Sequence, residues 1–402
     1  MSTHDTALRD ARPETIDEII AELAPGAAHR DLERELPVDF VNRLLAAGLG
    51  ALRVPAGYGG GGATIAELAE VLIALAAADS NLAQIFRGHL GFVELLRLWP
   101  RTPASEALLR SAGNGALFGP AASEKARPDG AASTLFDIRT RLVEDDEGLW
   151  LSGEKYYTTG SLFADWINVL VPQEQGFAEV VVPRDSPGLT ILDDWQGFGQ
   201  RLTASGTAIF DRVPVLPEHV FIHADQDAFR YIQAFYQFVH VSTQAGIAQR
   251  ISADIAETVR GRTRSYPLAA TSEPSKDHQV LAVVGETESR AYAARATARQ
   301  LALDLEKYIQ GSKVGDALDQ AVIGAASAQI SNTRLVGESA WLLFDAGSAS
   351  STDTALDLDR HWRNARTVSS HNPVIYKAAQ IGNYLVSGVV ANELASLRPA
   401  RS

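Results

Sequence analysis

Two of the nine histidines stand in settings where an imidazole could take part in a reaction. His89 lies within residues 87–91 (RGHLG), inside an otherwise apolar stretch that we expect to be helical. His371 lies at an expected helix start, where Pro373 suits the first helical turn. Histidine changes charge close to neutral pH, so either side chain could transfer a proton. The sequence equally permits structural roles, in which His89 packs within its helix and His371 caps one.

Two clusters of aromatic and hydroxyl side chains could line a ligand site. One is the segment Lys155–Ser161 (KYYTTGS), and the other is Asp194–Arg201 (DWQGFGQR). Aromatic rings stack on flat ligands, and hydroxyl groups bond to the edges of such ligands. Ordinary packing between strands explains both clusters equally well, so the sequence leaves the two interpretations open.

Several kinds of catalytic centre are excluded by residue type or spacing. The chain has no cysteine, which removes disulfides, thiolate metal sites and cysteine nucleophiles. The histidines form no metal-binding motif, and no HExxH sequence occurs, so we expect no metal. Ser123, Ser161 and Ser205 lie outside any GxSxG motif, so we do not expect a serine hydrolase.

The glycine run Gly59–Gly62 raises the question of a phosphate-binding loop. It lacks the Lys-Ser/Thr pair that follows in a P-loop, and no expected strand leads into a GxGxxG motif. We therefore interpret this run as a connection between two helices.

Charge and hydropathy narrow the setting in which the protein works. The formal net charge of −13 argues against a broad surface for nucleic acid or for an anionic membrane. Residues 1–12 are charged and have no apolar run, so we expect no signal peptide. No segment of about 18 apolar residues is free of charges, so we expect no membrane span. With the absence of cysteine, these features fit a cytoplasmic protein.

The first part of the chain has the periodicity of helices. Apolar residues recur at helical spacing over residues 13–29 and again over 40–45. Thr64 and Glu67 have the spacing of a capping box in front of an alanine-rich helix that reaches about residue 78. A further helix is expected over residues 81–98.

The middle of the chain has the pattern of strands. Residues 138–143 alternate between apolar and polar side chains, residues 144–148 form a turn, and residues 149–153 resume the alternation, which predicts a hairpin. Shorter strand-like runs, separated by glycine, proline and aspartate, follow at 166–171, 179–183, 189–192 and 207–210.

The last part of the chain is helical again. A loop is expected at residues 260–277, and the basic run 360–366 has the composition of a solvated face. Long helices in series favour an antiparallel bundle. The four expected helices cover residues 229–259, 281–309, 316–345 and 372–397.

These patterns together predict an α+β protein of three domains. Residues 1–118 form an N-terminal helical domain, residues 119–222 a central β barrel or sandwich, and residues 223–402 a C-terminal four-helix bundle. A chain of 402 residues is long enough for each domain to bury a core of its own.

Nearly the whole chain resembles the acyl-CoA dehydrogenase superfamily, which has this order of domains. The segment 153–161 (GEKYYTTGS) is similar to the strand of that family that faces the flavin. There an aromatic ring packs on the isoalloxazine, and a Thr or Ser bonds near its N5. The resemblance assigns these roles to Tyr157 and Thr159, with Ser161 close by.

The finer resemblance is to the flavin-dependent monooxygenase branch, typified by dibenzothiophene monooxygenase. Residues 78–94, 195–205 (beginning at Trp195) and 359–373 carry this resemblance. It implies catalytic roles for His371, His89 and Ser161, and contacts of Trp195 and Asn372 with the flavin. The chain departs from the branch at Asn372, where an aspartate is usual. It departs again at Pro120 or Ala121, where a flavin-side asparagine is usual.

The distribution of acidic residues favours oxygenation over dehydrogenation. A dehydrogenase of this family needs a carboxylate base to take a weakly acidic proton. The family places that base in the segment here spanning 367–373 or in the helix spanning 229–253. Neither segment contains Asp or Glu, although the chain has 49 acidic residues. His371 is the most plausible substitute.

The resemblance implies an oxidoreductase that receives reduced FMN from a separate NAD(P)H:flavin reductase. Oxygen would add at flavin C4a, His371 would stabilise the hydroperoxide, and a sulfur, nitrogen or electron-rich carbon atom of a small substrate would take the distal oxygen. Two alternatives stay open. One is an FAD-dependent dehydrogenase or oxidase with an unusual base, and the other is a non-catalytic scaffold of the same fold.

Two further expectations concern assembly and the cofactor phosphate. Arg262 and Arg264 could clamp a phosphate with bidentate geometry, so we expect one of them to bind that of FMN, within the chain or across a subunit boundary. The apolar, alanine-rich helix around residues 321–343 needs partners, and the resemblance implies a homotetramer built as a dimer of dimers.

Overall fold

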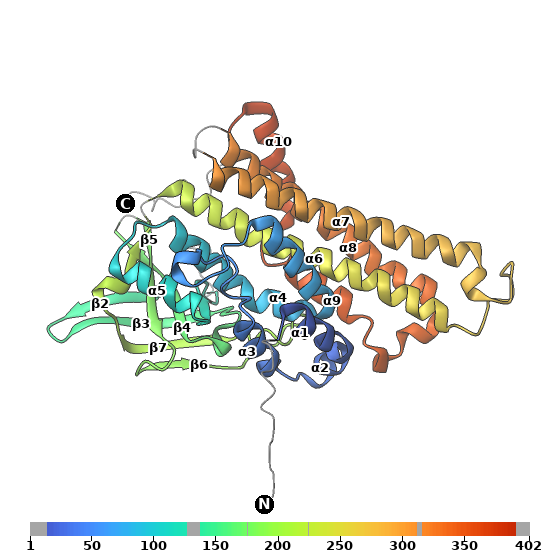
Figure 1. The fold of residues 1–402 in the computed structure, drawn as a ribbon, viewed down its shortest axis with the longest axis horizontal. Coiled ribbons are helices and arrows are strands. Elements are labelled where there is room, and N and C mark those ends of the chain that lie inside the picture. The colour runs from blue at the N-terminus through green and yellow to red at the C-terminus, as the bar shows by residue number, and fades with distance from the viewer. Residues whose placement is uncertain (1–13, 127–136, 175, 224, 312–315, 391–402) are drawn as a thin grey trace, which may run out of the picture.

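The computed structural model of the chain describes residues 14–126, 137–174, 176–223, 225–311 and 316–390. Helices come first, two sheets follow, and long helices end the chain, which confirms the predicted order (Figure 1). The N-terminal helices are α1 (Ile16–Leu23), α2 (Ala27–Glu33), α3 (Val38–Ala46), α4 (Ile65–Leu98) and α5 (Pro103–Gly113). The sequence did not predict α5.

Helix α4 consists of two helical segments joined at Asp79, as the two separate predictions imply. Asp79 has extended backbone angles (φ −156°, ψ 110°), and its carboxylate accepts from the backbone N–H of Asn81 at 3.1 Å, as an N-cap does. The first segment starts with the predicted capping box of Thr64 and Glu67. Gly59–Gly62 precede it as a plain connection, which confirms their interpretation.

The middle of the chain forms two four-stranded sheets in the orders β1-β4-β5-β8 and β2-β3-β7-β6. The predicted hairpin is β2–β3, with Arg141 opposite Ser152 and Asp145 opposite Gly148. The parallel pairing of β1 with β4 and the short β8 were not predicted. The strands are β1 (Phe118–Ala121), β2 (Arg141–Asp145), β3 (Gly148–Tyr156), β4 (Trp166–Gln173), β5 (Gly176–Pro183), β6 (Leu189–Ile191), β7 (Thr207–Pro214) and β8 (Val220–Ile222).

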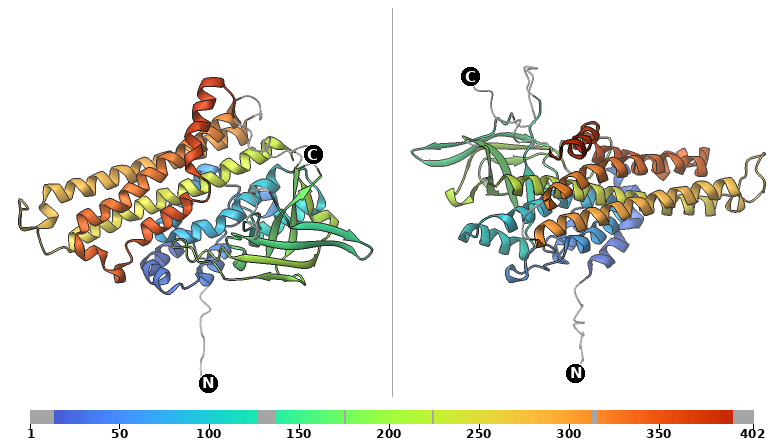
Figure 2. Two further views of the ribbon diagram at one scale, coloured as in Figure 1. Left: turned by 180° about the vertical axis from the view of Figure 1, so that it is seen from behind. Right: turned by 90° about the horizontal axis from the view of Figure 1, so that it is seen from above.

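Three long helices dominate the last part: α6 (Gln226–Gly261), α7 (His278–Gln310) and α8 (Ala317–Gly347). They extend away from the sheets, and two further views show the same separation (Figure 2). Within the described residues, no helix combines the length and apolar composition needed to span a bilayer.

Two predictions for the end of the chain need correction. The basic run taken for a solvated face forms helix α9 (Arg360–Ser369), whose His361, Ala365 and Val368 are buried. The predicted helix 372–397 is shorter, because α10 spans only Lys377–Ser387 and Gly388 ends it with a positive φ of 71°. Residues 391–397 lie outside the described part of the chain.

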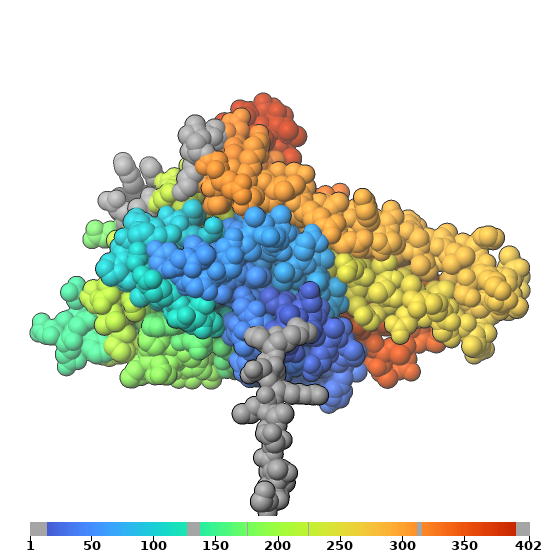
Figure 3. Space-filling view, viewed as in Figure 1, coloured from blue at the N-terminus to red at the C-terminus, as the bar shows by residue number. Residues whose placement is uncertain are grey.

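Helix α4 lies between the sheets and the bundle. In the space-filling view the N-terminal helices occupy the middle of one face, between the sheet domain and the long helices (Figure 3). Two glycines allow α4 and its neighbours to approach closely. A Cβ on Gly88 would lie 2.4 Å from the Pro120 ring of β1, and a Cβ on Gly246 of α6 would lie 2.5 Å from a carbonyl oxygen of α4.

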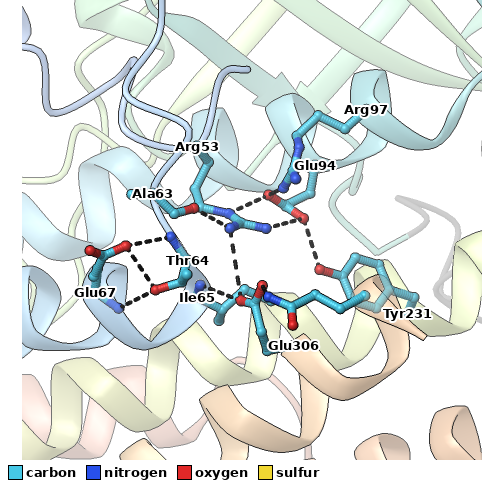
Figure 4. Close-up of polar contacts among 10 residues, drawn as sticks. Arg53, Ala63, Thr64, Ile65, Glu67, Glu94, Arg97, Tyr231 and Glu306 are labelled. Carbon is cyan, nitrogen blue, oxygen red and sulfur yellow. Dashed lines mark hydrogen bonds and ion pairs between the residues drawn. The ribbon is translucent and has the colours of Figure 1, made fainter. Parts of the chain in front are cut away.

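A buried carboxylate ties α4 to the rest of the fold (Figure 4). Glu94 has no exposed surface and accepts from Arg53 at 2.7 Å, from Arg97 at 2.5 Å and from the Tyr231 hydroxyl of α6 at 2.8 Å. Burial raises the pKa of Glu94, but the two guanidinium groups outweigh that effect and hold the pKa below its usual value. Glu306 of α7 accepts from the backbone N–H of Ile65 at 2.5 Å and extends the network to a third helix.

We expect Arg53→Met to reduce the free energy of unfolding by about 3–5 kcal/mol, because it leaves a buried carboxylate short of a partner. Arg299→Met removes an exposed pair with Glu70 and is the control, with an expected loss below about 1 kcal/mol. Denaturant unfolding of both variants measures the difference. Equal losses of unfolding free energy in the two variants would mean that the Glu94 network stabilises the fold no more than an exposed ion pair does.

Candidate active site

The segment 157–161 forms a turn held firmly at the end of β3. The backbone N–H of Thr158 donates to Gly206 at 3.2 Å, and that of Gly160 donates to Thr203 at 3.0 Å. These bonds hold Tyr157 at a φ of 66°, a conformation that costs a bulky residue roughly 1–2 kcal/mol. The Tyr157 ring is 54% exposed and lies edge-on to Trp195, with ring centroids 6.1 Å apart.

A chain of hydroxyl groups runs inward from Thr159. The Oγ1 of Thr159 lies 2.7 Å from the Oγ of Ser205, which lies 2.7 Å from the Oγ1 of Thr203. Thr203 donates to the carbonyl oxygen of Gln200 at 2.8 Å, and this carbonyl can only accept. Ser205 therefore donates to Thr203, and Thr159 donates to Ser205. The lone pairs of Thr159 remain free to accept a bond from a ligand.

Ser161 has a structural contact, and its predicted role at the flavin site stays a prediction. Its hydroxyl donates to the carbonyl oxygen of Pro120 at 2.9 Å, and the residue has no exposed surface. A Cβ on Gly119 would lie 2.5 Å from Ser161, so β1 packs directly on it. Ser161 thus fixes β1 to the turn and positions its neighbours.

His89 has two backbone partners in the structure, and its predicted catalytic role stays a prediction. Its Nδ1 accepts from the backbone N–H of Phe118 at 3.1 Å, so its Nε2 carries the proton and donates to the carbonyl of Gly50 at 2.8 Å. Both ring nitrogens are occupied, and the residue is fully buried. Burial lowers the pKa of His89 to about 4, which keeps the ring neutral.

His371 follows α9, and several polar contacts fix that helix. His361 bonds to Asp254 of α6 at 2.6 Å, and Arg363 pairs with Asp31 of α2 at 2.8 Å. Asn364 accepts from the backbone N–H of Gln200 at 2.6 Å. Since the carbonyl of Gln200 ends the hydroxyl chain, the helix that precedes His371 is joined to the turn that carries Thr159.

The side chain of His371 lies beside His240 of α6, and the charge of Arg87 of α4 acts on it. It is open to solvent, yet burial among surrounding protein lowers its pKa to about 3, with a further contribution from the charge of Arg87. Its ring centroid lies 4.7 Å from that of His240. Burial, then Arg87 and His371, lower the pKa of His240 as well. Both imidazoles are therefore neutral at pH 7.

No carboxylate is recorded among the described groups that act on these two histidines. Arg87 lowers the pKa of both histidines, His371 lowers that of His240, and Asn372 bonds to His371. The structure thus brings an imidazole pair and a guanidinium together. The described ranges also contain no group of His, Asp and Glu suited to a metal ion.

The remaining predicted residues lie in different places. Trp195 is half-buried, and its Nε1 donates to Gln200 at 2.9 Å, beside the hydroxyl chain. The carbonyl of Asn372 accepts from Gln329 of α8 at 3.0 Å. Arg262 and Arg264 follow the end of α6, at the end of the bundle far from the sheets of the same chain (Figure 1).

Two residues of this site were missed at the level of sequence: Arg87 and His240. The single arginine inside the apolar stretch of α4 could have indicated a functional residue, because arginine is rarely buried in a helix unless it is paired. His240 gave no such signal, since its importance comes from contact with a residue 131 positions later in the chain.

Comparison with known proteins assigns the family. Residues 5–99, 121–213 and 238–375 match the models of the N-terminal, middle and C-terminal domains of acyl-CoA dehydrogenase. The chain belongs to the acyl-CoA dehydrogenase family.

Its relatives within this family include monooxygenases. The chain is 31% identical over 365 residues to a dibenzothiophene monooxygenase of Mycolicibacterium goodii, covering 86% of each chain. It is 25% identical to SfnC of Pseudomonas putida, a probable FMNH2-dependent monooxygenase, covering 92% of this chain and 93% of that one.

Two solved structures resemble the fold closely. The methanesulfinate monooxygenase MsuC of Pseudomonas fluorescens has a TM-score of 0.84 and 26% identity, covering 95% of this chain and 98% of that one. FMN-bound TdsC of Paenibacillus sp. A11-2 has a TM-score of 0.86 at 24% identity, covering 94% and 97%, and this match concerns the fold alone.

The buried histidines predict a loss of stability in acid. The pKa of His89 is about 4 in the folded protein and near 6.5 when unfolded, so the unfolded chain binds protons first as pH falls. Stability should decrease between pH 6.5 and 4, by roughly 3 kcal/mol for His89 alone at 1.36 kcal/mol per pKa unit.

We expect His89→Gln to be less stable at pH 8, because Phe118 loses its acceptor, but to show a shallower decline in acid. Urea unfolding at pH 8, 6 and 5 measures both effects, and the exposed His29→Gln serves as the control. A decline as steep as that of the wild type would refute the assignment.

Proposed function

We infer that this protein is a flavin-dependent monooxygenase. It would transfer one atom of dioxygen to a small organic substrate and the other to water, with two electrons from reduced FMN. Membership of the family and the monooxygenase relatives support this function. The observation that carries it is the neutral pair His371–His240, without a recorded carboxylate, at the position of the dehydrogenase base.

The residues around Tyr157 fit FMN. The exposed ring of Tyr157, with Trp195 beside it, offers an aromatic surface to a flat ligand. The free lone pairs of Thr159 suit a ligand N–H, and reduced flavin carries one at N5. When bound, reduced FMN would supply the electrons that activate oxygen. We retain Tyr157, Thr159, Ser161, Trp195 and Asn372 as proposed cofactor contacts. His371, His89 and Ser161 stay the proposed catalytic residues.

His371 has the properties of a proton donor at neutral pH. A neutral imidazole has one N–H to donate and one nitrogen to accept, so it can deliver a proton to the departing oxygen and recover one from solvent. Its low pKa prevents a permanent charge at this position. The sulfur, nitrogen or electron-rich carbon atom that is oxygenated would lie beside His371.

The partners and setting of the reaction are further proposals. Reduced FMN would reach the site by diffusion from a separate NAD(P)H:flavin reductase, which places the protein in the cytoplasm with its nicotinamide supply. We also propose the domain boundaries 1–118, 119–222 and 223–402. The relatives act on substrates as different as dibenzothiophene and methanesulfinate, so the family alone leaves the substrate class of this chain open.

Rapid mixing tests the proposed function. Protein titrated with reduced FMN without oxygen and then mixed with oxygen should pass through a transient spectrum distinct from both reduced and oxidised FMN. A direct return to oxidised flavin, with bound FAD preferred, would instead indicate a dehydrogenase or oxidase. Failure to bind any flavin would indicate a scaffold.

We expect His371→Ala to bind FMN normally but to release hydrogen peroxide in place of oxygenated product. The rate of product formation should fall about 100- to 10,000-fold, as for loss of a general acid–base group. His371→Asn should be nearly as poor, because an amide cannot transfer a proton, while exposed His29→Ala should match the wild type. Product formed per oxygen consumed is the measurement, and an unaltered ratio in His371→Ala would remove this residue from the mechanism.

We propose that Arg264 or Arg262 binds the FMN phosphate of a neighbouring subunit in a homotetramer. Both follow α6, whose C-terminal end lies away from the sheets of the same chain (Figure 1), and Arg264 is exposed. Large exposed apolar side chains on the helices and turn of the C-terminal region support assembly: Tyr292, Leu303, Trp341, Ile375, Tyr376, Leu385 and Val386.

Arg264→Ala should weaken reduced FMN about 10- to 100-fold, the range for charge-assisted hydrogen bonds. Reduced riboflavin, which lacks the phosphate, should bind the variant and the wild type equally. Anaerobic titration provides both affinities, and light scattering should show the same tetrameric mass. Unchanged affinity for FMN in this variant and in Arg262→Ala, or a monomeric wild type, would contradict the proposal.

A further inference from the structure

Three arginines are buried in the described part of the chain, and one of them lacks an acidic partner. Arg30 pairs with Asp79 at 3.1 Å, and Arg53 pairs with Glu94 at 2.7 Å. Arg87 is only 9% exposed, yet no ion pair joins it to any described carboxylate. Burying a guanidinium without a carboxylate is costly, so Arg87 needs a reason other than stability.

The contacts that Arg87 does make orient it without neutralising it. Its Nε donates weakly to the carbonyl of Tyr236 at 3.4 Å, and its guanidinium carbon lies 4.4 Å from the centre of the Tyr236 ring. Gly91, one turn further along α4, leaves the space that this ring fills, since a Cβ there would lie 2.0 Å from it. Burial lowers the pKa of Arg87 to about 10, so it stays charged at neutral pH.

Polar atoms without partners surround the same contact between α4 and α6. Gln84 lies one turn before Arg87 on α4, and its Oε1 is buried without a hydrogen bond. On α6, both polar atoms of Gln237 and the Nε2 of His240 are buried without a partner. Buried polar atoms are nearly always bonded in folded proteins, so such a group of exceptions points to a missing ligand.

This cluster adjoins the proposed reaction site. The His240 ring lies 4.7 Å from that of His371, and the charge of Arg87 acts on both. A group held by Arg87 would therefore lie next to the imidazole that is proposed to donate a proton.

We propose that Arg87 binds the anionic head group of the substrate, a two-oxygen oxyanion such as a sulfinate or a carboxylate, with Gln237 as a further donor. A guanidinium presents two parallel N–H groups that match two oxygens. This assignment rests on the proposed monooxygenase function, whose substrate class it specifies.

Equilibrium binding tests the proposal with protein saturated with oxidised FMN. The probes are benzenesulfinate, benzoate and methyl phenyl sulfoxide, which share a phenyl ring while only the first two carry a charge. We expect the wild type to bind at least one of the two anions more tightly than the sulfoxide. Arg87→Met should lose about 10- to 100-fold in affinity for that anion, the range for charge-assisted bonds, with no change for the sulfoxide.

Two variants serve as controls. Arg299→Met removes the same charge from an exposed position and should bind every probe as the wild type does. Arg87→Lys keeps the charge but not the paired N–H groups, and its anion affinity should be intermediate. If Arg87→Met does not fold, Arg87→Lys decides, because unchanged anion affinity in that variant overturns the proposal.

Other outcomes separate this proposal from the proposed function. Equal affinity of the wild type for the sulfoxide and both anions, or unchanged anion affinity in Arg87→Met, overturns the assignment of Arg87. Loss of FMN affinity in Arg87→Met also overturns it, since the arginine would then serve the cofactor. Absence of the transient after mixing with oxygen counts against the monooxygenase alone, because anion binding is measured without turnover.

Discussion

The buried carboxylate of Glu94 holds helix α4 against the bundle, and the rest of the site depends on where α4 lies. Two arginines and the hydroxyl of Tyr231 converge on this carboxylate, so it joins the loop before α4, α4 itself and α6. A buried charge with strong partners tolerates little displacement, because each lost bond exposes an uncompensated charge to a medium of low polarity. The network therefore sets both the depth and the rotation of α4.

The rotation of α4 matters because two of its faces serve different parts of the site. Ile85 and Gly88 face the sheet domain, where a Cβ on Gly160 would touch the Ile85 carbonyl and Pro120 packs on Gly88. Arg87 lies on a different side and faces Tyr236 of α6. The same helix thus packs against the turn that contains Thr159 and carries Arg87, the cation whose charge acts on His371. A change in its rotation would disturb both halves of the site together.

Much of the fold could be predicted because it follows from periodicity and local chemistry. Neighbouring residues in the sequence are enough to predict the long helices α6, α7 and α8, the β2–β3 hairpin and the capping box at Thr64. Helix α9 was missed because its arginines suggested solvent, whereas they pair with acids from distant segments such as Asp31. Local pattern cannot reveal such partners.

The site was predictable only in part, for the same reason. The roles of His371 and His89 come from motifs and stay predictions, whereas the backbone partners of His89, Gly50 and Phe118, are too distant in sequence to be predicted. The significance of Arg87 lies in a partner that is absent, which no sequence pattern records. The roles of Tyr157 and Thr159 toward the flavin stay predictions. They are supported by the hydrogen bonds that hold the turn of residues 157–161 in place.

The unpartnered atoms of Gln84, Gln237 and His240 also bear on selectivity. A site with unpartnered polar groups selects its ligand mainly by excluding other molecules. A molecule that cannot hydrogen-bond to these groups removes their water and leaves each of them without a partner. Such rejection reaches about 10,000-fold or more, far beyond the roughly 10- to 200-fold that a misfit of one methylene provides in an apolar pocket. A hydrocarbon of the right shape would thus be excluded from this site more effectively than a substrate of the wrong size.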